Sequence, residues 1–416
     1  MAFVKKDVSC GEFELRIAIL SDFHLGYNED ALLQAREALH KSLAEADLVL
    51  LAGDLFDNRV PKQEVLHDAI ALFSELKEEA RKSGKLRGLR FLALNEQDER
   101  LELPSETPFV AIYGTHERRS KGLINVVQML AAASLVLNCH ARKILVEKGR
   151  ESVCFQGMGG LPEDFARQAL KLLEPKPVPN AFNIFAFHQT LTELIPYSDE
   201  FLSVNDLPPG FDLYVDGHIH WNRELKADGK HVLIPGSTVV TQMKSNETHS
   251  KGYYIFETLT KEAEFKPIYS RPFHYLELKF ESASPADVEK EARAKLEEAV
   301  KSETRGKPLV KLKLMGTLAK GFTPASVDSS AVEKEFAPRA FVSVDKEFEA
   351  EELKQKIELL RRLREERVSS REMGLKLLRE KLEALQSPLA TRAEELFEAL
   401  TSGESEEVLR RLGEKG

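Results

Sequence analysis

The sequence contains little cysteine and no long hydrophobic run. Its three cysteines, Cys10, Cys139 and Cys154, are odd in number and lack CxxC spacing, which argues against disulfide or zinc–thiolate chemistry. The longest apolar runs, such as ADLVLLAG and FNIFAFH, are far shorter than the ~20 residues that a membrane-spanning helix needs. The opening residues, MAFVKKDVSCGEFEL, show no signal-peptide pattern. We therefore expect a cytoplasmic protein that does not enter a membrane.

An excess of positive charge is also missing. The 416 residues include 59 Lys and Arg against 68 Asp and Glu, which gives a net charge of -9. A simple nucleic-acid-binding module would normally show a basic domain. Any polyanionic substrate must therefore be held by local basic clusters, by bound metal cations or by a partner protein. The stretches ERRSKG and ARKILVEKGR are the local basic clusters that could touch phosphates.

Residues 1–272 alternate short apolar runs with amphipathic helical stretches. The strands are expected in ELRIAILSD, ADLVLLAGD, TPFVAIYG, FNIFAFH and FDLYVDGH, and the first helix in NEDALLQAREALHKSLAEA. This alternation predicts an α/β layered domain whose strands are buried on both faces. The later runs HVLIPGSTVV and KGYYIFETL are rich in β-forming residues and are consistent with a second sheet in the same domain.

Residues 273–345 predict a small α+β domain. The strands are expected in FHYLELKF, PLVKLKLMG and RAFVSVD, one helix begins near Pro285, and a shorter helix lies in DSSAVEKEF. Proline suits the first turn of a helix because that turn does not use its N–H.

Residues 346–416 predict helices. Leu353, Ile357, Leu360 and Leu363 fall on one helical stripe, Ser369 and Glu372 have the spacing of a capping box, and Ser387-Pro388 begins a further helix. This tail either packs on its own domain as a helical hairpin or docks against the helices of another protein.

Aspartate and histidine stand immediately after five of the apolar runs. A lone histidine is more often a satisfied core residue than a ligand. Five strand ends, however, can converge on one crevice, because parallel α/β sheets bind ligands beyond the carboxyl ends of their strands. Clustered imidazoles and carboxylates are costly to bury without cations. The candidate residues are Asp22, His24, Asp54, Thr115, His116, His188, His218 and His220.

The types of these side chains indicate a centre with two metal ions. Carboxylate and imidazole without thiolate suit manganese, iron, zinc or nickel. One carboxylate can bridge two ions roughly 3.5–4 Å apart, and such a pair stabilises both the attacking and the leaving oxygen in phosphoryl displacement. The sequence thus favours hydrolysis of a phosphate ester.

The order D-x-H, G-D, G-[N]-H-[D/E], H, G-H-x-H resembles the signature of the calcineurin-like metallophosphoesterases. The stretches SDFHLG, GDLFD, GHIH, IPGST and KGYYIFE follow the order of one branch, the double-strand-break repair nucleases called Mre-eleven, or SbcD in bacteria. The chain is similar to the archaeal form over essentially its whole length. The resemblance implies a four-layer sandwich of two sheets flanked by helices, followed by a small cap domain and a helical tail.

The resemblance also implies a function. It implies a manganese-dependent nuclease, with 3′–5′ exonuclease activity on double-stranded DNA and endonuclease activity on single-stranded DNA, which processes double-strand breaks. The cap at 273–345 would contact DNA, and 346–416 would bind the Rad-fifty ATPase. Such a protein would be cytoplasmic, nucleoid-associated and homodimeric, and the apolar stretch GLINVVQMLAAASLV is a candidate for the dimer contact or an ordinary core helix.

Roles for single residues follow from the same resemblance. Two ions would activate a water for in-line attack on phosphorus, with magnesium, iron, zinc or nickel as alternatives to manganese. His116 would stabilise charge on the phosphoryl oxygens or assist the leaving group. One ion would be held by Asp22, His24, Asp54 and His220, and the other by Asp54, His188, His218 and Thr115, with Asp54 as the bridge.

Two positions depart from the family pattern. Thr115 replaces an Asn whose amide oxygen reaches further by about one bond length, ~1.2–1.5 Å, and is a good neutral ligand for a hard cation. We therefore expect a weaker second metal site beside an intact first one. Asp57, in GDLFD, replaces a His that assists exonuclease action in many relatives. An acidic group there could repel phosphate or orient a water, which leaves the balance of exonuclease and endonuclease activity open.

Two other functions remain in competition with the nuclease. The first is a phosphoesterase for small phosphodiesters, which would have no use for a cap or a helical tail. The second is a catalytically attenuated scaffold subunit that tethers the ATPase. Thr115 and Asp57 are the only residues that support this alternative.

Overall fold

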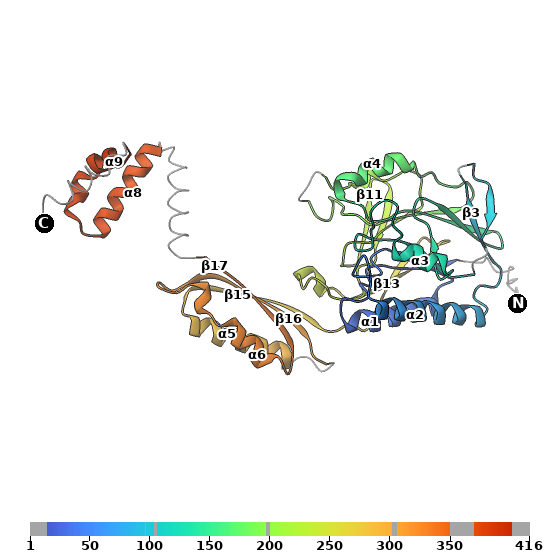
Figure 1. Ribbon diagram of the computed structural model, residues 1–416, viewed down its shortest axis with the longest axis horizontal. Coiled ribbons are helices and arrows are strands. Elements are labelled where there is room, and N and C mark those ends of the chain that lie inside the picture. The colour runs from blue at the N-terminus through green and yellow to red at the C-terminus, as the bar shows by residue number, and fades with distance from the viewer. Residues whose placement is uncertain are drawn as a thin grey trace, which may run out of the picture. The chain divides into compact units, whose positions relative to one another are not determined.

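The computed structural model describes residues 15–95, 97–103, 106–196, 200–301, 306–349 and 370–401. Cys10, Ser369 and the predicted stripe Leu353, Ile357, Leu360 and Leu363 lie outside these residues. The chain divides into two compact units: one holds 1–276, 295–312 and 333–343, and the other holds 277–294, 313–332 and 344–416. Figure 1 labels helices and strands of both units. No helix among the described residues is long and apolar enough to span a membrane.

A six-stranded sheet holds three of the predicted strands side by side. These three pair in parallel, and β13 runs antiparallel along β1. The strand order is β14 (Ala263–Pro267), β13 (Gly252–Glu257), β1 (Arg16–Leu20), β2 (Leu48–Ala52), β5 (Phe109–Ile112) and β6 (Leu137–Asn138).

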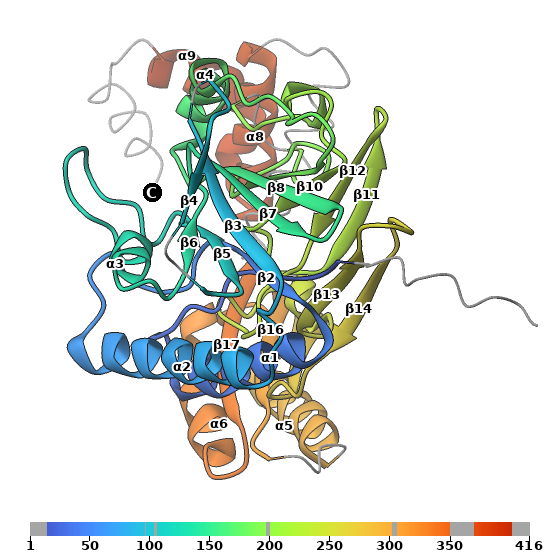
Figure 2. The ribbon, with the colours of Figure 1, turned by 90° about the vertical axis from the view of Figure 1, so that its right-hand side faces the viewer.

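Two helices lie side by side along the outer face of this sheet, as both ribbon views show (Figure 2). They are α1 (Glu29–Glu45), which follows the first predicted helix, and α2 (Gln63–Lys82). The side chain of Asn28 caps α1 by accepting the Ala31 N–H, and Glu29 and Asp30 in the first turn favour the positive end of the helix dipole. The carboxyl end of β1 is thus joined to α1 by a short loop.

An eight-stranded sheet holds the other two predicted strands, β9 and β10, which pair in parallel. The β-rich runs after His231 do not form a sheet of their own: β12 pairs in parallel with β10, whereas β13 joins the first sheet. The strand order is β11 (Arg223–Ala227), β12 (Lys230–Ile234), β10 (Leu213–Asp216), β9 (Phe182–Phe187), β8 (Glu151–Met158), β7 (Lys143–Lys148), β3 (Leu89–Leu94) and β4 (Arg100–Glu102).

One hydrophobic core lies between the two sheets. It joins Leu50 and Ile112 of the first sheet to Phe155 and Ile184 of the second, all completely buried. Truncation of such a residue, for example Leu50→Ala, would destabilise the fold by about 2–5 kcal/mol. With α1 and α2 outside one sheet and α4 (Glu163–Leu173) outside the other, the expected four-layer sandwich is confirmed.

The elements predicted for 273–345 are all present. The three strands form a sheet in the order β15 (Phe273–Ala283), β16 (Leu309–Leu318) and β17 (Phe341–Glu349). The helices are α5 (Pro285–Lys301), which begins at the predicted proline, and α6 (Ser329–Phe336).

The described part of the tail is helical, as predicted. It comprises α8 (Ser370–Ala384), the 3₁₀ turn η4 (Pro388–Arg392) and α9 (Ala393–Thr401). Leu396 and Ala399 of α9 pack against Leu378 and Leu389, so the two helices form a hairpin with a small apolar contact of its own.

Candidate metal centre

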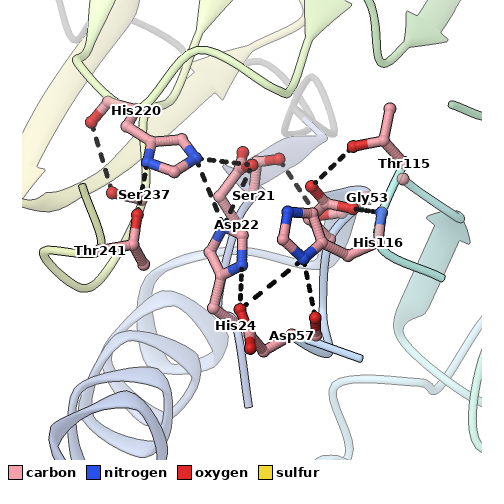
Figure 3. Close-up of polar contacts among 12 residues, drawn as sticks. Ser21, Asp22, His24, Gly53, Asp57, Thr115, His116, His220, Ser237 and Thr241 are labelled. Carbon is pink, nitrogen blue, oxygen red and sulfur yellow. Dashed lines mark hydrogen bonds and ion pairs between the residues drawn. The ribbon is translucent and has the colours of Figure 1, made fainter. Parts of the chain in front are cut away.

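All eight residues predicted for the site lie directly after strands. The carboxyl ends of β1, β2 and β5 in one sheet and of β9 and β10 in the other meet at one edge of the sandwich. Figure 3 shows five of the side chains gathered there, Asp22, His24, Thr115, His116 and His220. Asp22 and His24 follow β1, Asp54 follows β2, Thr115 and His116 follow β5, His188 follows β9, and His218 and His220 follow β10.

The backbone of this site is strained. Asp22, His24, Asp54 and His218 have φ angles of 54°, 48°, 49° and 68°, in the left-handed region that side chains other than glycine rarely adopt. Such conformations persist only where the surrounding structure enforces them, and they concentrate at functional sites.

Two glycines allow the loops to come this close. A Cβ atom on Gly114 would lie 2.1 Å from Oδ1 of Asp54, and one on Gly217 would lie 2.1 Å from the Ala52 carbonyl oxygen and 2.5 Å from Nδ1 of His188. Any larger residue at either position would push the ligand-bearing loops apart.

The first cluster consists of Asp22, His24 and His220, all buried. The Nε2 atoms of the two imidazoles are 3.3 Å apart. Oδ1 of Asp22 lies 3.8 Å from Nε2 of His24 and 3.7 Å from Nε2 of His220. Neither carboxylate oxygen of Asp22 has a hydrogen-bond partner among the described residues.

A carboxylate lies behind each imidazole of this cluster. Nδ1 of His24 lies 3.3 Å from Oδ1 of Asp57, and Nδ1 of His220 lies 3.2 Å from Oε1 of Glu247. Glu247 accepts the hydrogen bond from Nδ1 of His220, so this Nδ1 carries the proton and Nε2 presents its lone pair. Nδ1 of His24 is close to Asp57 but makes no hydrogen bond to it. Two Nε2 atoms 3.3 Å apart beside a carboxylate without a hydrogen-bond partner form a donor set that a cation would complete, so the residues fit a metal ion.

Glu247 is itself held by a buried lysine. Nζ of Lys251 lies 3.2 Å from Oε2 of Glu247 and 2.8 Å from Oγ of Ser237. Burial would raise the pKa of Glu247, but the bond from His220 and the charge of Lys251 lower it to about 2. Neither Glu247 nor Lys251 was predicted from the sequence to belong to the site. Lys251 opens the stretch KGYYIFE, whereas nothing in the sequence around Glu247 distinguishes it from a surface residue.

The second cluster consists of Asp54, His188 and His218. Nε2 of His188 lies 3.1 Å from Oδ2 of Asp54, and its Nδ1 lies 2.8 Å from the carbonyl oxygen of Ala52. That carbonyl can only accept, so His188 also turns an unprotonated Nε2 toward the cluster in its neutral form.

The pKa values in the second cluster show a strong pairing. Burial opposes the charge on His188, but Asp54 raises its pKa to about 10. Burial likewise opposes the charge on Asp54, but the imidazolium of His188 holds the Asp54 pKa well below its usual range. Burial and the charge of His188 lower the pKa of His218 to about 3. When no cation is bound, a proton on His188 therefore lies between His188 and Asp54.

Thr115 and His116 both contact Asp54. The Thr115 hydroxyl donates to Oδ2 at 3.3 Å, and the His116 backbone N–H donates to Oδ1 at 2.8 Å. The structure thus brings Thr115 to the cluster, and its role as a metal ligand stays a prediction.

Glu117, the residue after His116, ties two of the loops together. It is completely buried, and its two carboxylate oxygens accept the N–H of Phe56 at 3.0 Å and of Gly114 at 2.8 Å. Burial, helped by the charge of Asp54, raises its pKa to about 8. In the sequence, Glu117 stands out only as the first residue of the basic stretch ERRSKG, and no role was predicted for it.

A cavity of about 570 Å³ opens beside the two clusters. His116 lies in its wall with 44% of its side chain exposed, and its Nδ1 is 2.7 Å from the Asp57 carbonyl oxygen, which leaves Nε2 to meet a substrate. Asp57 also approaches His24, and its pKa is lowered mainly by that imidazole. The lining residues are Asp57, Asn58, Arg59, Val60, Thr115, His116 and Arg118.

Comparisons with curated proteins find double-strand break repair proteins. The DNA double-strand break repair protein Mre11 of Methanopyrus kandleri is 30% identical over 244 residues, covering 54% of this chain and 48% of that protein. The double-strand break repair protein MRE11 of Encephalitozoon cuniculi is 32% identical over 265 residues, covering 58% and 45%. The human protein of the same name is 26% identical over 281 residues, covering 58% and 39%. The chain spans about half the length, or less, of these relatives.

The family model for calcineurin-like phosphoesterases matches residues 15–222, which is half of the 416-residue chain. This range holds every strand that ends at the two clusters, and every residue predicted for the site. By this match and by its four-layer fold, the chain belongs to the calcineurin-like phosphoesterase family.

Proposed function

We propose that this protein is a metal-dependent DNA nuclease that hydrolyses phosphodiester bonds at the two clusters. One observation carries the proposal. His188 and His220 each donate from Nδ1 to an acceptor, the Ala52 carbonyl oxygen and the Glu247 carboxylate, so that each turns Nε2 toward a buried carboxylate. Histidines that bind metals usually donate their other ring N–H to a carbonyl or carboxylate oxygen in this way.

The proposed ligands follow the two clusters. Asp22, His24 and His220 would hold one ion, and His188, His218 and Thr115 the other, with Asp54 shared between them. The two divalent cations would supply the positive charge that acidifies water and stabilises phosphoryl oxygens. Manganese is our first choice, and magnesium, iron, zinc and nickel are alternatives for this set of oxygen and nitrogen donors.

His116 is the proposed catalytic residue beside Asp54. Its ring is partly exposed in the cavity, and Nδ1 is bonded to the Asp57 carbonyl oxygen. Its Nε2 can therefore donate a hydrogen bond to a phosphoryl oxygen or a proton to the leaving oxygen when the ring is protonated.

DNA is the proposed substrate for two reasons. The cavity carries Arg59 and Arg118 next to His116, which gives an acidic protein a local basic surface for phosphates. The relatives in the comparisons are named as double-strand break repair proteins. We propose 3′–5′ exonuclease action on double-stranded DNA and endonuclease action on single-stranded DNA. Asp57 contacts His24, and this contact fixes an acidic group in the cavity wall. A fixed negative charge there affects the approach of DNA phosphates, and so the balance between exonuclease and endonuclease action.

The remaining parts of the chain would serve the same reaction. We propose that 1–272 is the nuclease domain, that the α+β domain at 273–345 contacts DNA, and that 346–416 binds a Rad-fifty ATPase in the repair of double-strand breaks. Within the tail, Leu385 and Leu400 are 76% and 50% exposed beside the hairpin's own apolar contact. An apolar surface of this kind suits docking against partner helices.

A second copy of the chain is the proposed partner for helix α3 (Val126–Ala132). The helix is shorter than the apolar stretch suggested: Asn125 caps it, and it ends before Ala133. Its buried residues Val126, Val127 and Leu130 serve the core, whereas Leu123, Ile124 and Met129 on and before it are 54%, 66% and 46% exposed. Pairing of this exposed patch with its counterpart would remove it from water.

A cleavage assay separates the nuclease from its alternatives. The full chain is incubated with manganese and with single-stranded DNA, double-stranded DNA or a small aryl phosphodiester, alongside His220→Ala and the control His67→Ala, which changes an exposed histidine on α2. We expect DNA cleavage by the wild type and the control but not by His220→Ala. Hydrolysis of the small ester without preference for DNA would favour a small-molecule phosphodiesterase. No cleavage at all, with retained binding to the ATPase, would favour the scaffold.

A further inference from the structure

Tyr27 is an exposed aromatic residue that is fixed at both ends. Its backbone N–H donates to the carbonyl oxygen of His24 at 2.9 Å, in the turn that follows β1. Its hydroxyl donates to the carbonyl oxygen of Thr241 at 2.7 Å. The residue is nevertheless 43% exposed, so the hydroxyl is anchored while much of the ring remains open to solvent.

The surroundings of Tyr27 place it at the rim of the first cluster. The Thr241 hydroxyl lies 2.9 Å from Nδ1 of His220, so the hydroxyl anchor of Tyr27 is one residue away from a proposed ligand. Its other anchor is His24 itself. The pKa of Tyr27 is raised by partial burial and then by the charges of Glu247 and Asp57, the two carboxylates that hold His220 and His24. The two hydrogen bonds of Tyr27 thus tie it to the backbone of His24 and to Thr241, whose hydroxyl contacts His220.

A fixed, exposed ring at this place is suited to stacking. The hydrogen bond from the hydroxyl to Thr241 does not require the ring to be exposed. Exposure of an apolar ring to water is also unfavourable, so the bond alone does not explain why the ring stays at the surface. Stacking of a nucleobase on an aromatic side chain is sequence-tolerant and is worth ~1–3 kcal/mol per base. Because the Tyr27 ring is already immobilised, binding a base to it loses little side-chain entropy.

We propose that Tyr27 stacks on a nucleobase next to the scissile phosphate, and so makes this centre select nucleoside phosphodiesters over phosphodiesters without a base. This inference rests on the proposed hydrolytic function and names its substrate class. Tyr27 is a specificity residue here: it contacts the substrate away from the phosphate and leaves the chemistry to the two clusters.

Two esters and two variants test the proposal. The esters are thymidine 5′-(p-nitrophenyl phosphate) and its counterpart in which hydrogen replaces the base, and both release p-nitrophenol. Tyr27→Ala removes the ring, Tyr27→Phe keeps the ring and removes the bond to Thr241, and Tyr269→Ala is the control for loss of an exposed tyrosine, since Tyr269 is 48% exposed. KM and kcat are measured with manganese for each pair, and the melting temperature checks the fold of each variant.

The expected result is a coupling between base and ring. In Tyr27→Ala, KM for the thymidine ester rises about tenfold, while KM for the baseless ester and kcat for both stay near the wild-type values; Tyr27→Phe and Tyr269→Ala behave like the wild type. The proposal is overturned if Tyr27→Ala affects both esters equally, or if Tyr27→Phe loses as much as Tyr27→Ala, because the hydroxyl anchor would then be the function. A wild type that cleaves DNA but neither ester would also overturn the proposal, because one base beside the phosphate would then not suffice for recognition. A wild type that cleaves neither DNA nor the esters would overturn the proposed function itself.

Discussion

The two clusters of the candidate centre are built from the same kinds of side chain but are supported differently. In the first, both imidazoles rest on carboxylates, Asp57 and Glu247, and Glu247 is fixed by the buried Lys251. In the second, His188 rests on a neutral backbone carbonyl. The side chain of His218 is 32% exposed, and its carboxylate neighbour, Oε1 of Glu163, lies 3.9 Å from Nε2 and not behind the ring at Nδ1. A carboxylate behind an imidazole fixes its tautomer and raises its basicity toward a metal. The first cluster is therefore the better-built cation site.

Thr115 adds to this difference. It stands at the second cluster, where the family pattern has an Asn, and its hydroxyl donates to Asp54 instead of presenting a carbonyl oxygen. The second cluster thus differs from the first in three ways: its imidazoles have weaker hydrogen-bond partners, the side chain of His218 is more exposed, and its neutral ligand position is occupied by Thr115. We therefore predict that one cation binds tightly, at the first cluster, and one weakly, at the second.

The largest effect is expected at the residue that the two clusters share. Asp54→Asn removes the anionic charge from both proposed sites while nearly keeping the size of the side chain. We expect DNA cleavage to fall by at least about 10²–10³-fold and the second cation to be lost in a calorimetric titration with manganese. Cleavage within a few-fold of the His67→Ala control would contradict the shared role of Asp54.

The second cluster should respond strongly to pH. Without a cation, the His188 pKa is about 10, so a cation must displace a proton at any pH below that value. Its apparent affinity should therefore rise with pH, by about tenfold per unit or about 100-fold from pH 6 to pH 8. Calorimetry of the weaker manganese site in buffers of different ionisation enthalpy measures both the affinity and the released proton. A pH-independent second site would argue against this pairing.

The carboxylate that holds His220 in the first cluster can be removed without changing the second cluster. Glu247→Gln leaves His220 without an anionic partner, and we expect the tight site to weaken by about 10–100-fold while the second site changes little. Glu224→Gln is a matched control, because Glu224 pairs with His231 on β11 and β12, away from the clusters. Equal weakening of both sites by Glu247→Gln would mean that the two clusters are not independently supported.

The smallest effect is expected from restoring the family residue. Thr115→Asn supplies a carbonyl oxygen that reaches further by about one bond length, so we expect the second cation to bind up to about tenfold more tightly and the first to be unaffected. Wild-type protein that binds two manganese ions equally tightly would already refute the predicted difference.

Much of the site was predictable because its signals are local. An apolar run followed by Asp-x-His or Gly-Asp encodes a strand end in consecutive residues, and the structure brings all these ends together. The supports were not predictable in the same way. Glu247 reaches His220 from 27 residues away, and the carbonyl behind His188 belongs to Ala52, 136 residues earlier. Such contacts depend on how the sheets are paired, which the sequence pattern also left open for β12 and β13.

We propose that six carboxylate and imidazole groups chelate two divalent cations at one edge of the sandwich. Crystals of the protein grown with manganese would reveal the cations by anomalous diffraction. We expect two peaks at this edge: a strong one among Asp22, His24 and His220, and one of lower occupancy at His188 and His218, with Asp54 between them. An ordered site without an anomalous peak at saturating manganese would contradict it.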